Sequence, residues 1–145
     1  MADSSYGPFF NKFTGLADGA GSIVHVDFKP AGGLSKCLSA PATEIATFYF
    51  EGEPPSDYFD GVHKFDQITQ EAGVPGFLGL AIGKTHEEVE RECVKGHAMV
   101  LAIGWQSVDL HMEYRASQGF KDNIHLLRST AKKIEMHHVA FMQSL

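Results

Sequence analysis

The chain is poor in cysteine and in basic residues, and each shortage excludes a class of protein. Only two of its 145 residues are cysteines, Cys37 and Cys93, and they lack the paired spacing of a zinc site. We therefore expect reduced thiols and a cytosolic protein. Lysine and arginine number 12 against 18 acidic residues, which gives a net charge of −6. Surfaces that neutralise nucleic-acid phosphates are basic, so we expect no nucleic-acid partner.

Long apolar runs and ordered ligand motifs are also missing. No run approaches the roughly 20 apolar residues that span a bilayer, so we expect no membrane association. The first residues show no basic segment followed by an apolar core, so no secretory leader is expected. Residues 76–83 lack the glycine order of a phosphate loop. The eight histidines show no ligand spacing supported by carboxylates or thiolates, so we predict no metal site.

What the sequence does contain is a regular alternation of strand and helix patterns. Its apolar fraction of 43% is enough for a single core. From residue 43 the order is β-α-β-β-α-β. Strands are predicted at 44–51, 77–84, 97–105 and 134–142. Helices are predicted at 58–72 and from 108 onward, with a bend near 117–119, and the charged segment 85–95 is predicted to be a short helix or a solvated excursion. Two consecutive βαβ units predict an α+β, ferredoxin-like sandwich with an antiparallel sheet.

The first 41 residues precede this order. Residues 6–17 have the spacing of an aromatic amphipathic helix, 23–29 alternate as a strand, and 30–41 are predicted to be a loop or linker because they contain paired glycines and two prolines. Residues 22–28 resemble 135–141, which indicates a weak internal repeat. We therefore expect an N-terminal helix and strand extension at 1–41, the remnant of a preceding repeat with its linker, and a ferredoxin-like domain at 42–145.

Strand 97–105 places large side chains on one side and small ones on the other. His97, Met99, Leu101, Ile103 and Trp105 alternate with alanine, valine and glycine. In a ferredoxin-like sandwich the helices cover one face of the sheet. The other face is too apolar to meet water, so we expect a second copy to cover it in a homodimer.

Two pairs of polar side chains are candidates for chemistry. His111 and Tyr114 lie three apart and share a helix face, so both can point into a cavity between helix and sheet. An imidazole there can take a proton from a phenol or an acidic carbon while Tyr114 binds the oxyanion, or the histidine can be purely structural. His137 and His138 are neighbours on a strand and must point to opposite faces, so they cannot chelate one metal ion. Either is a candidate base or a structural histidine.

The residues that follow strand 97–105 form a family motif. They are Trp105, Ser107, His111, Tyr114 and Ser117. In this pattern the chain resembles the antibiotic-biosynthesis-monooxygenase (ABM) type of the dimeric α/β-barrel superfamily. It looks closest to the C-terminal repeat of fungal tandem proteins of that type. The segments that carry this likeness are Ser5-Tyr6-Gly7-Pro8-Phe9, His25-Val26-Asp27-Phe28 and Ala40-Pro41-Ala42-Thr43-Glu44.

The resemblance implies a dimeric α/β barrel that acts in secondary metabolism on an aromatic or polyketide-like molecule, first of all as a cofactor-independent monooxygenase. A polyketide cyclase or aldol-type lyase of the same fold, and a non-catalytic binding or assembly barrel, remain alternatives. The proximal histidine of the haem-degrading branch falls on Ile124, and His125 is rotated by about 100° round the helix, which argues against haem. The asparagine of several cofactor-free members has no counterpart in 43–50, where Glu44 and Thr47 are the polar candidates.

We therefore expect His111, Tyr114 and His138 to be catalytic and no cofactor to be bound. In the oxygenase hypothesis a base deprotonates a hydroxyarene, whose anion reacts with oxygen; in the cyclase hypothesis the same base takes a proton from an activated carbon. Trp105 can stack on a flat substrate or belong to the core. The residues expected to contact the substrate are Trp105, His137, Tyr49, Glu44 and Phe120.

Overall fold

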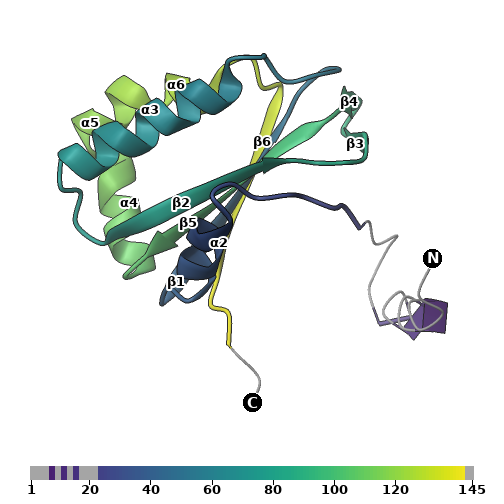
Figure 1. Cartoon of the computed structure of the whole chain (residues 1–145), viewed down its shortest axis with the longest axis horizontal. Coiled ribbons are helices and arrows are strands. Elements are labelled where there is room, and N and C mark those ends of the chain that lie inside the picture. The colour runs from purple at the N-terminus through teal and green to yellow at the C-terminus, as the bar shows by residue number, and fades with distance from the viewer. Residues whose placement is uncertain (1–6, 9–10, 13–14, 17–22, 143–145) are drawn as a thin grey trace.

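The computed structural model describes residues 7–8, 11–12, 15–16 and 23–142 (Figure 1). Its centre is a four-stranded antiparallel sheet in the order β2-β5-β1-β6. The strands are β1 (Ala42–Tyr49), β2 (Phe77–Lys84), β5 (Ala98–Trp105) and β6 (Lys133–Val139). Helices α3 (Tyr58–Glu71), α4 (Val108–Ala116), α5 (Gln118–Asn123) and α6 (His125–Arg128) lie on one face of the sheet. The predicted α+β ferredoxin-like order is confirmed.

The core lies between the sheet and these helices. On β5 the large residues Met99, Leu101, Ile103 and Trp105 are each 3% exposed or less and belong to this core. Phe48 of β1 and helix residues such as Val62 and Phe65 meet them. The large-and-small alternation of β5 therefore sets which face of the sheet the helices cover.

The helical region after β5 is broken into three short pieces. The predicted bend occurs at Ser117, where the backbone leaves the helical conformation and the hydroxyl accepts a hydrogen bond from the Phe120 N–H at 3.2 Å. That hydrogen bond caps α5, so the chain turns and starts again. Among the described residues, no helix has both the length and the apolar character that crossing a bilayer requires.

Residues 30–41 contain a helix, so the loop predicted there is wrong. Helix α2 (Ala31–Leu38) packs on β2 and β5 from the face opposite α3 (Figure 1). Of the two glycines that suggested a loop, Gly33 instead permits close packing, since a Cβ there would lie 2.9 Å from the Pro30 ring and 3.3 Å from the Leu80 carbonyl. The small face of β5 accepts the helix, because a Cβ on Gly104 would lie 3.3 Å from the Cys37 Cα.

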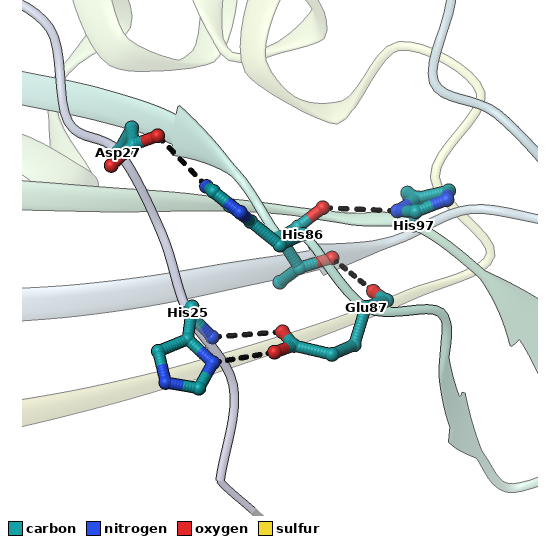
Figure 2. A network of polar contacts seen from close by, with 6 residues as sticks. His25, Asp27, His86, Glu87 and His97 are labelled. Carbon is teal, nitrogen blue, oxygen red and sulfur yellow. Dashed lines mark hydrogen bonds and ion pairs between the residues drawn. The ribbon is translucent and has the colours of Figure 1, made fainter. Parts of the chain in front are cut away.

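Residues 23–29 run beside the edge strand β2 without forming a regular strand. Lys29 and Ile82 exchange two backbone hydrogen bonds of 2.8 and 3.0 Å, and the His86 N–H donates to the His25 carbonyl at 2.8 Å. Side chains add to this pairing, with Glu87 accepting from the His25 N–H at 2.8 Å and Asp27 lying 2.8 Å from the His86 ring (Figure 2). The segment thereby protects an exposed sheet edge. Half of the helix predicted at 6–17 lies outside the described residues.

Residues 85–95 form a hairpin, so the short helix predicted as one alternative is wrong. Strands β3 (Val89–Arg91) and β4 (Val94–Gly96) meet through Glu92 and Cys93, whose φ values are 50° and 68°. Tight hairpin turns need positive φ and usually take it from glycine or asparagine. Neither residue stands here, so the turn could not be predicted from the sequence. The hairpin is tied to β6 by Arg91, whose Nε lies 2.7 Å from a Glu135 oxygen.

Candidate active site

A cavity of about 280 Å³ lies between the sheet and the helices that cover it. Its walls are mainly apolar and include Phe48, Phe65, Phe120, Ile124 and Met136. The polar or ionisable side chains that reach it are few, and they are Glu44, Trp105, His111, Tyr114, Arg115 and Arg128. An apolar hollow with a few convergent polar groups fits a small, largely apolar molecule.

Glu44 presents a buried carboxyl to this cavity from β1. The residue is 8% exposed, and its Oε2 accepts a hydrogen bond from the Trp105 Nε1–H at 3.1 Å and lies 3.2 Å from His111 Nε2. The other oxygen, Oε1, has no hydrogen-bond partner among the residues that the structure describes. Burial raises the pKa of Glu44 to about 7, against the opposing effects of the Trp105 hydrogen bond and the Arg115 charge. Near neutral pH the carboxyl can therefore both accept and release a proton.

His111 links Glu44 to His138. Its Nδ1 lies 2.7 Å from His138 Nε2. Burial, and then the charges of His138 and Arg115, lower the pKa of His111 to about 4, so the ring is neutral at pH 7. Within the His111–His138 pair, one of these two ring nitrogens donates and the other accepts. Glu44, His111 and His138 thus form a contiguous row of polar side chains from the cavity to a half-buried histidine.

The end of β5 and the start of α4 position the His111 ring. Ser107 lies two residues after the end of the strand, and its Oγ accepts a hydrogen bond from the Leu110 N–H at 3.2 Å. This N-cap starts the helix, which places His111 in its first turns. The imidazole stacks on the Trp105 indole with ring centroids 4.6 Å apart and planes 20° apart. The Trp–Ser–His spacing of the sequence therefore has a geometric reason.

The ring of Tyr114 borders the cavity, while its hydroxyl is hydrogen-bonded to helix α3. The hydroxyl lies 3.2 Å from Thr69 Oγ1, which itself donates to the Phe65 carbonyl at 2.8 Å. The phenol must therefore be the donor to Thr69. Burial raises the pKa of Tyr114, and the Thr69 hydrogen bond opposes that shift. Phe120 packs edge-on against the Tyr114 ring at 5.5 Å between centroids.

Two of the predicted site residues lie on the opposite face of the sheet. The β1–β6 register pairs Glu44 with His138 and Ile45 with His137, so only His138 shares a face with Glu44. Tyr49 also points to that opposite face, where its hydroxyl donates to Glu135 Oε2 at 3.0 Å. The structure thus brings together Glu44, Trp105, His111, Tyr114, Phe120 and His138, and it places His137 and Tyr49 elsewhere.

Sequence reasoning missed Arg115 and Arg128 as cavity residues. Arg115 is four residues after His111 and so shares its helix face, a spacing that could have identified it. Arg128 comes from the short helix α6, whose orientation no simple period predicts. Within the described ranges, no group of three histidine, cysteine or acidic side chains is arranged to hold a metal ion.

No family model matches this sequence, and no curated protein matches it either. Solved structures do resemble it. One is a proposed antibiotic biosynthesis monooxygenase from Bordetella bronchiseptica. The alignment covers 70% of this chain and 97% of that protein, at 21% identity and a TM-score of 0.54. For a protein from Arabidopsis thaliana the alignment covers 72% of this chain and 99% of that protein, at 10% identity and a TM-score of 0.54. SnoaB, a cofactor-independent oxygenase from Streptomyces nogalater, covers 72% of this chain and 95% of its own at 18% identity, with a TM-score of 0.49. The first two show a shared fold.

Proposed function

We propose that this chain is a small enzyme that deprotonates an aromatic or polyketide-like molecule in the cavity and lets the anion react with oxygen, without a bound cofactor. One observation carries the proposal. Glu44 lines an apolar cavity, its Oε1 has no partner among the described residues, and burial holds the pKa of the carboxyl at about 7. A general base works best when its pKa lies near the working pH.

The proposed chemistry balances with oxygen as the only co-substrate. Glu44 takes the phenolic proton of a hydroxyarene, and the electron pair of the arenolate forms a carbon–oxygen bond to O2 at a ring C–H. Glu44 returns its proton to the resulting peroxide, and loss of water leaves a quinone. One oxygen atom enters the product and the other enters water, which is the stoichiometry of a monooxygenase.

The neighbouring side chains orient the base. The Trp105 hydrogen bond and the nearby His111 Nε2 both lie at Oε2, which leaves Oε1 for the substrate. His138 holds the His111 ring through the hydrogen bond at Nδ1, so we assign His138 a positioning role. Stacking on Trp105 keeps the imidazole from rotating. The base is therefore held in place before the substrate binds.

Two alternatives use the same site differently. A polyketide cyclase or aldol-type lyase would draw the proton from an activated carbon, and it would consume no oxygen. A non-catalytic binding or assembly barrel predicts a filled interior, and the cavity of about 280 Å³ weighs against it.

The test is oxygen uptake by the whole chain with a panel of hydroxyarenes and polyketide-like phenols. We expect uptake with the wild type and a loss of about a hundredfold or more in Glu44→Gln, which keeps the shape of the side chain but removes the base. His137→Gln is the matched control because its ring lies across the sheet. Ring closure without oxygen uptake would favour the cyclase, and uptake that is unchanged in Glu44→Gln would contradict the proposed base.

We also propose that a second copy covers the sheet face opposite α3. Helix α2 packs on β2 and β5. A groove of about 470 Å³ lies over β1 and β5, between residues 24–28 and strand β3. Ile45, Thr47 and Val100 lie in its floor. Nearby, Val139 and Phe141 are 37% and 47% exposed. Apolar surface of this kind is typical of an interface. The fungal secondary-metabolism role, the cytosolic location and the division at residue 41 stay predictions from the sequence.

A further inference from the structure

Arg115 brings a positive charge to the cavity that no described residue neutralises. It lies on the same helix face as His111, is half-buried and lines the cavity. Its guanidinium has no hydrogen bond or ion pair to the residues that the structure describes, whereas Arg91 on the other face of the sheet is paired with Glu135. Burial raises the pKa of Glu44, and the Arg115 charge opposes that shift. Burial lowers the pKa of His111 and of His138, and the Arg115 charge adds to both shifts.

A second arginine reaches the same cavity from another helix. Arg128 of α6 lines it, and its side chain likewise has no partner within the described part of the chain. Glu44 is the only carboxylate in the lining, and burial leaves it about half protonated at neutral pH. The cavity is therefore net positive, although the chain as a whole carries −6. Arginine forks recognise carboxylates through paired hydrogen bonds.

The geometry points to a substrate that is an aromatic carboxylic acid, whose carboxylate is bound by Arg115 with Arg128 while its ring lies among the apolar walls. This inference rests on the proposed function for the placement of the reacting hydroxyl near Glu44. Two carboxylates repel one another, so the ligand carboxylate lies at the arginine side and away from Glu44. Arg115 and Arg128 thus set both the choice of substrate and its orientation.

The experiment compares two probes that differ by one carboxylate. Binding of 6-hydroxy-2-naphthoate, whose hydroxyl and carboxylate are at opposite ends of the ring system, and of 2-naphthol is measured by titration calorimetry on the whole chain at neutral pH. We expect the naphthoate to bind about tenfold or more tightly than the naphthol, with the difference shrinking at high salt. Arg115→Gln and Arg128→Gln should each lower naphthoate affinity, and the double variant should remove the preference while naphthol affinity stays.

Control variants keep the result interpretable. Arg91→Gln removes a guanidinium on the other face of the sheet and should leave both affinities unchanged. Arg115→Lys should restore part of the preference, because lysine keeps the charge but not the fork. Circular dichroism confirms that each variant is folded.

The outcomes separate this inference from the proposed function. Equal affinity for the two probes, or a preference that survives in the double variant, overturns the inference, while Glu44-dependent oxygen uptake with naphthol leaves the function standing. An arginine-dependent preference without oxygen uptake from any probe keeps the inference and overturns the oxygenase. If neither probe binds at millimolar concentration, the inference is wrong, and oxygen uptake with the panel of hydroxyarenes decides the proposed function.

Discussion

Glu44 is a carboxyl whose burial destabilises the protein as the pH rises. Its ordinary pKa of 4.5 is raised to about 7 in the folded chain, so the folded state holds the proton more tightly than the unfolded state. The stability from this proton is complete below pH 4.5 and is lost as the pH rises through 7. Such a shift corresponds to about 3 kcal/mol at most.

We therefore expect Glu44→Gln to flatten the fall in stability above pH 4.5. Thermal unfolding of both proteins over a pH series measures it. Glu135→Gln is a control of opposite sign, because the Arg91 hydrogen bond lowers the pKa of Glu135 and the stability it contributes is lost as the pH falls. Parallel pH profiles for wild type and Glu44→Gln would show that this carboxyl titrates normally.

The adjacent histidines offer a second comparison between single residues. His138→Ala removes the hydrogen bond to His111 Nδ1, so we expect kcat to fall roughly tenfold or more and its pH profile to shift. His137→Ala makes the same change on the other face and should leave kcat unchanged. The measurement is steady-state kcat of the wild type and both variants, with any substrate found by oxygen uptake. Equal effects of the two substitutions would remove the positioning role of His138.

Helix α2 can be tested through its two neighbouring glycines. A Cβ on Gly32 would meet nothing within 4 Å, so Gly32→Ala should stabilise the protein by up to about 1 kcal/mol through helix propensity. A Cβ on Gly33 would lie 2.9 Å from the Pro30 ring and 3.3 Å from the Leu80 carbonyl, so Gly33→Ala should destabilise it. Urea unfolding measures both. The same sign for both substitutions would contradict the packing of α2 on β2.

The elements that could be predicted from the sequence have an apolar period, and the elements that were missed have none. Strands β1, β2, β5 and β6 and helix α3 have a clear apolar period, because each buries one face in the core. Helix α2 begins with paired glycines, of which Gly33 lies against the Leu80 carbonyl of the sheet, and hairpin β3–β4 turns through Glu92 and Cys93. Their conformations depend on tertiary contacts that no local pattern contains.

For the candidate site, the residues could be named from the sequence, but the face of the sheet on which each strand residue lies could not. His111, Tyr114 and Trp105 came from local spacing along one strand and one helix. The choice between His137 and His138, and the position of Tyr49, depended on how β6 pairs with β1. Glu44 was identified as a polar substrate contact, but its role as a base depends on burial, which raises its pKa.

At the scale of the whole molecule, the proposed dimer makes a direct prediction. Ile45 lies half-buried in the groove over β1, so Ile45→Lys should shift a dimer toward monomer, and Val139→Asp should do the same. Met112→Lys is the control, because Met112 is 47% exposed on α4 on the helical side. Sedimentation velocity over a concentration series measures this. A wild type that sediments as a monomer throughout would exclude the dimer.

The intrinsic fluorescence of Trp105 should report on the candidate site. It is the only tryptophan in the chain, it stacks on His111, and its indole N–H is bonded to Glu44. A protonated imidazole withdraws electron density from an excited indole and quenches its emission. The intrinsic fluorescence should therefore dim as the pH falls toward the His111 pKa of about 4, and it should change when a ligand fills the cavity. Events at the candidate site can thus be followed without any label.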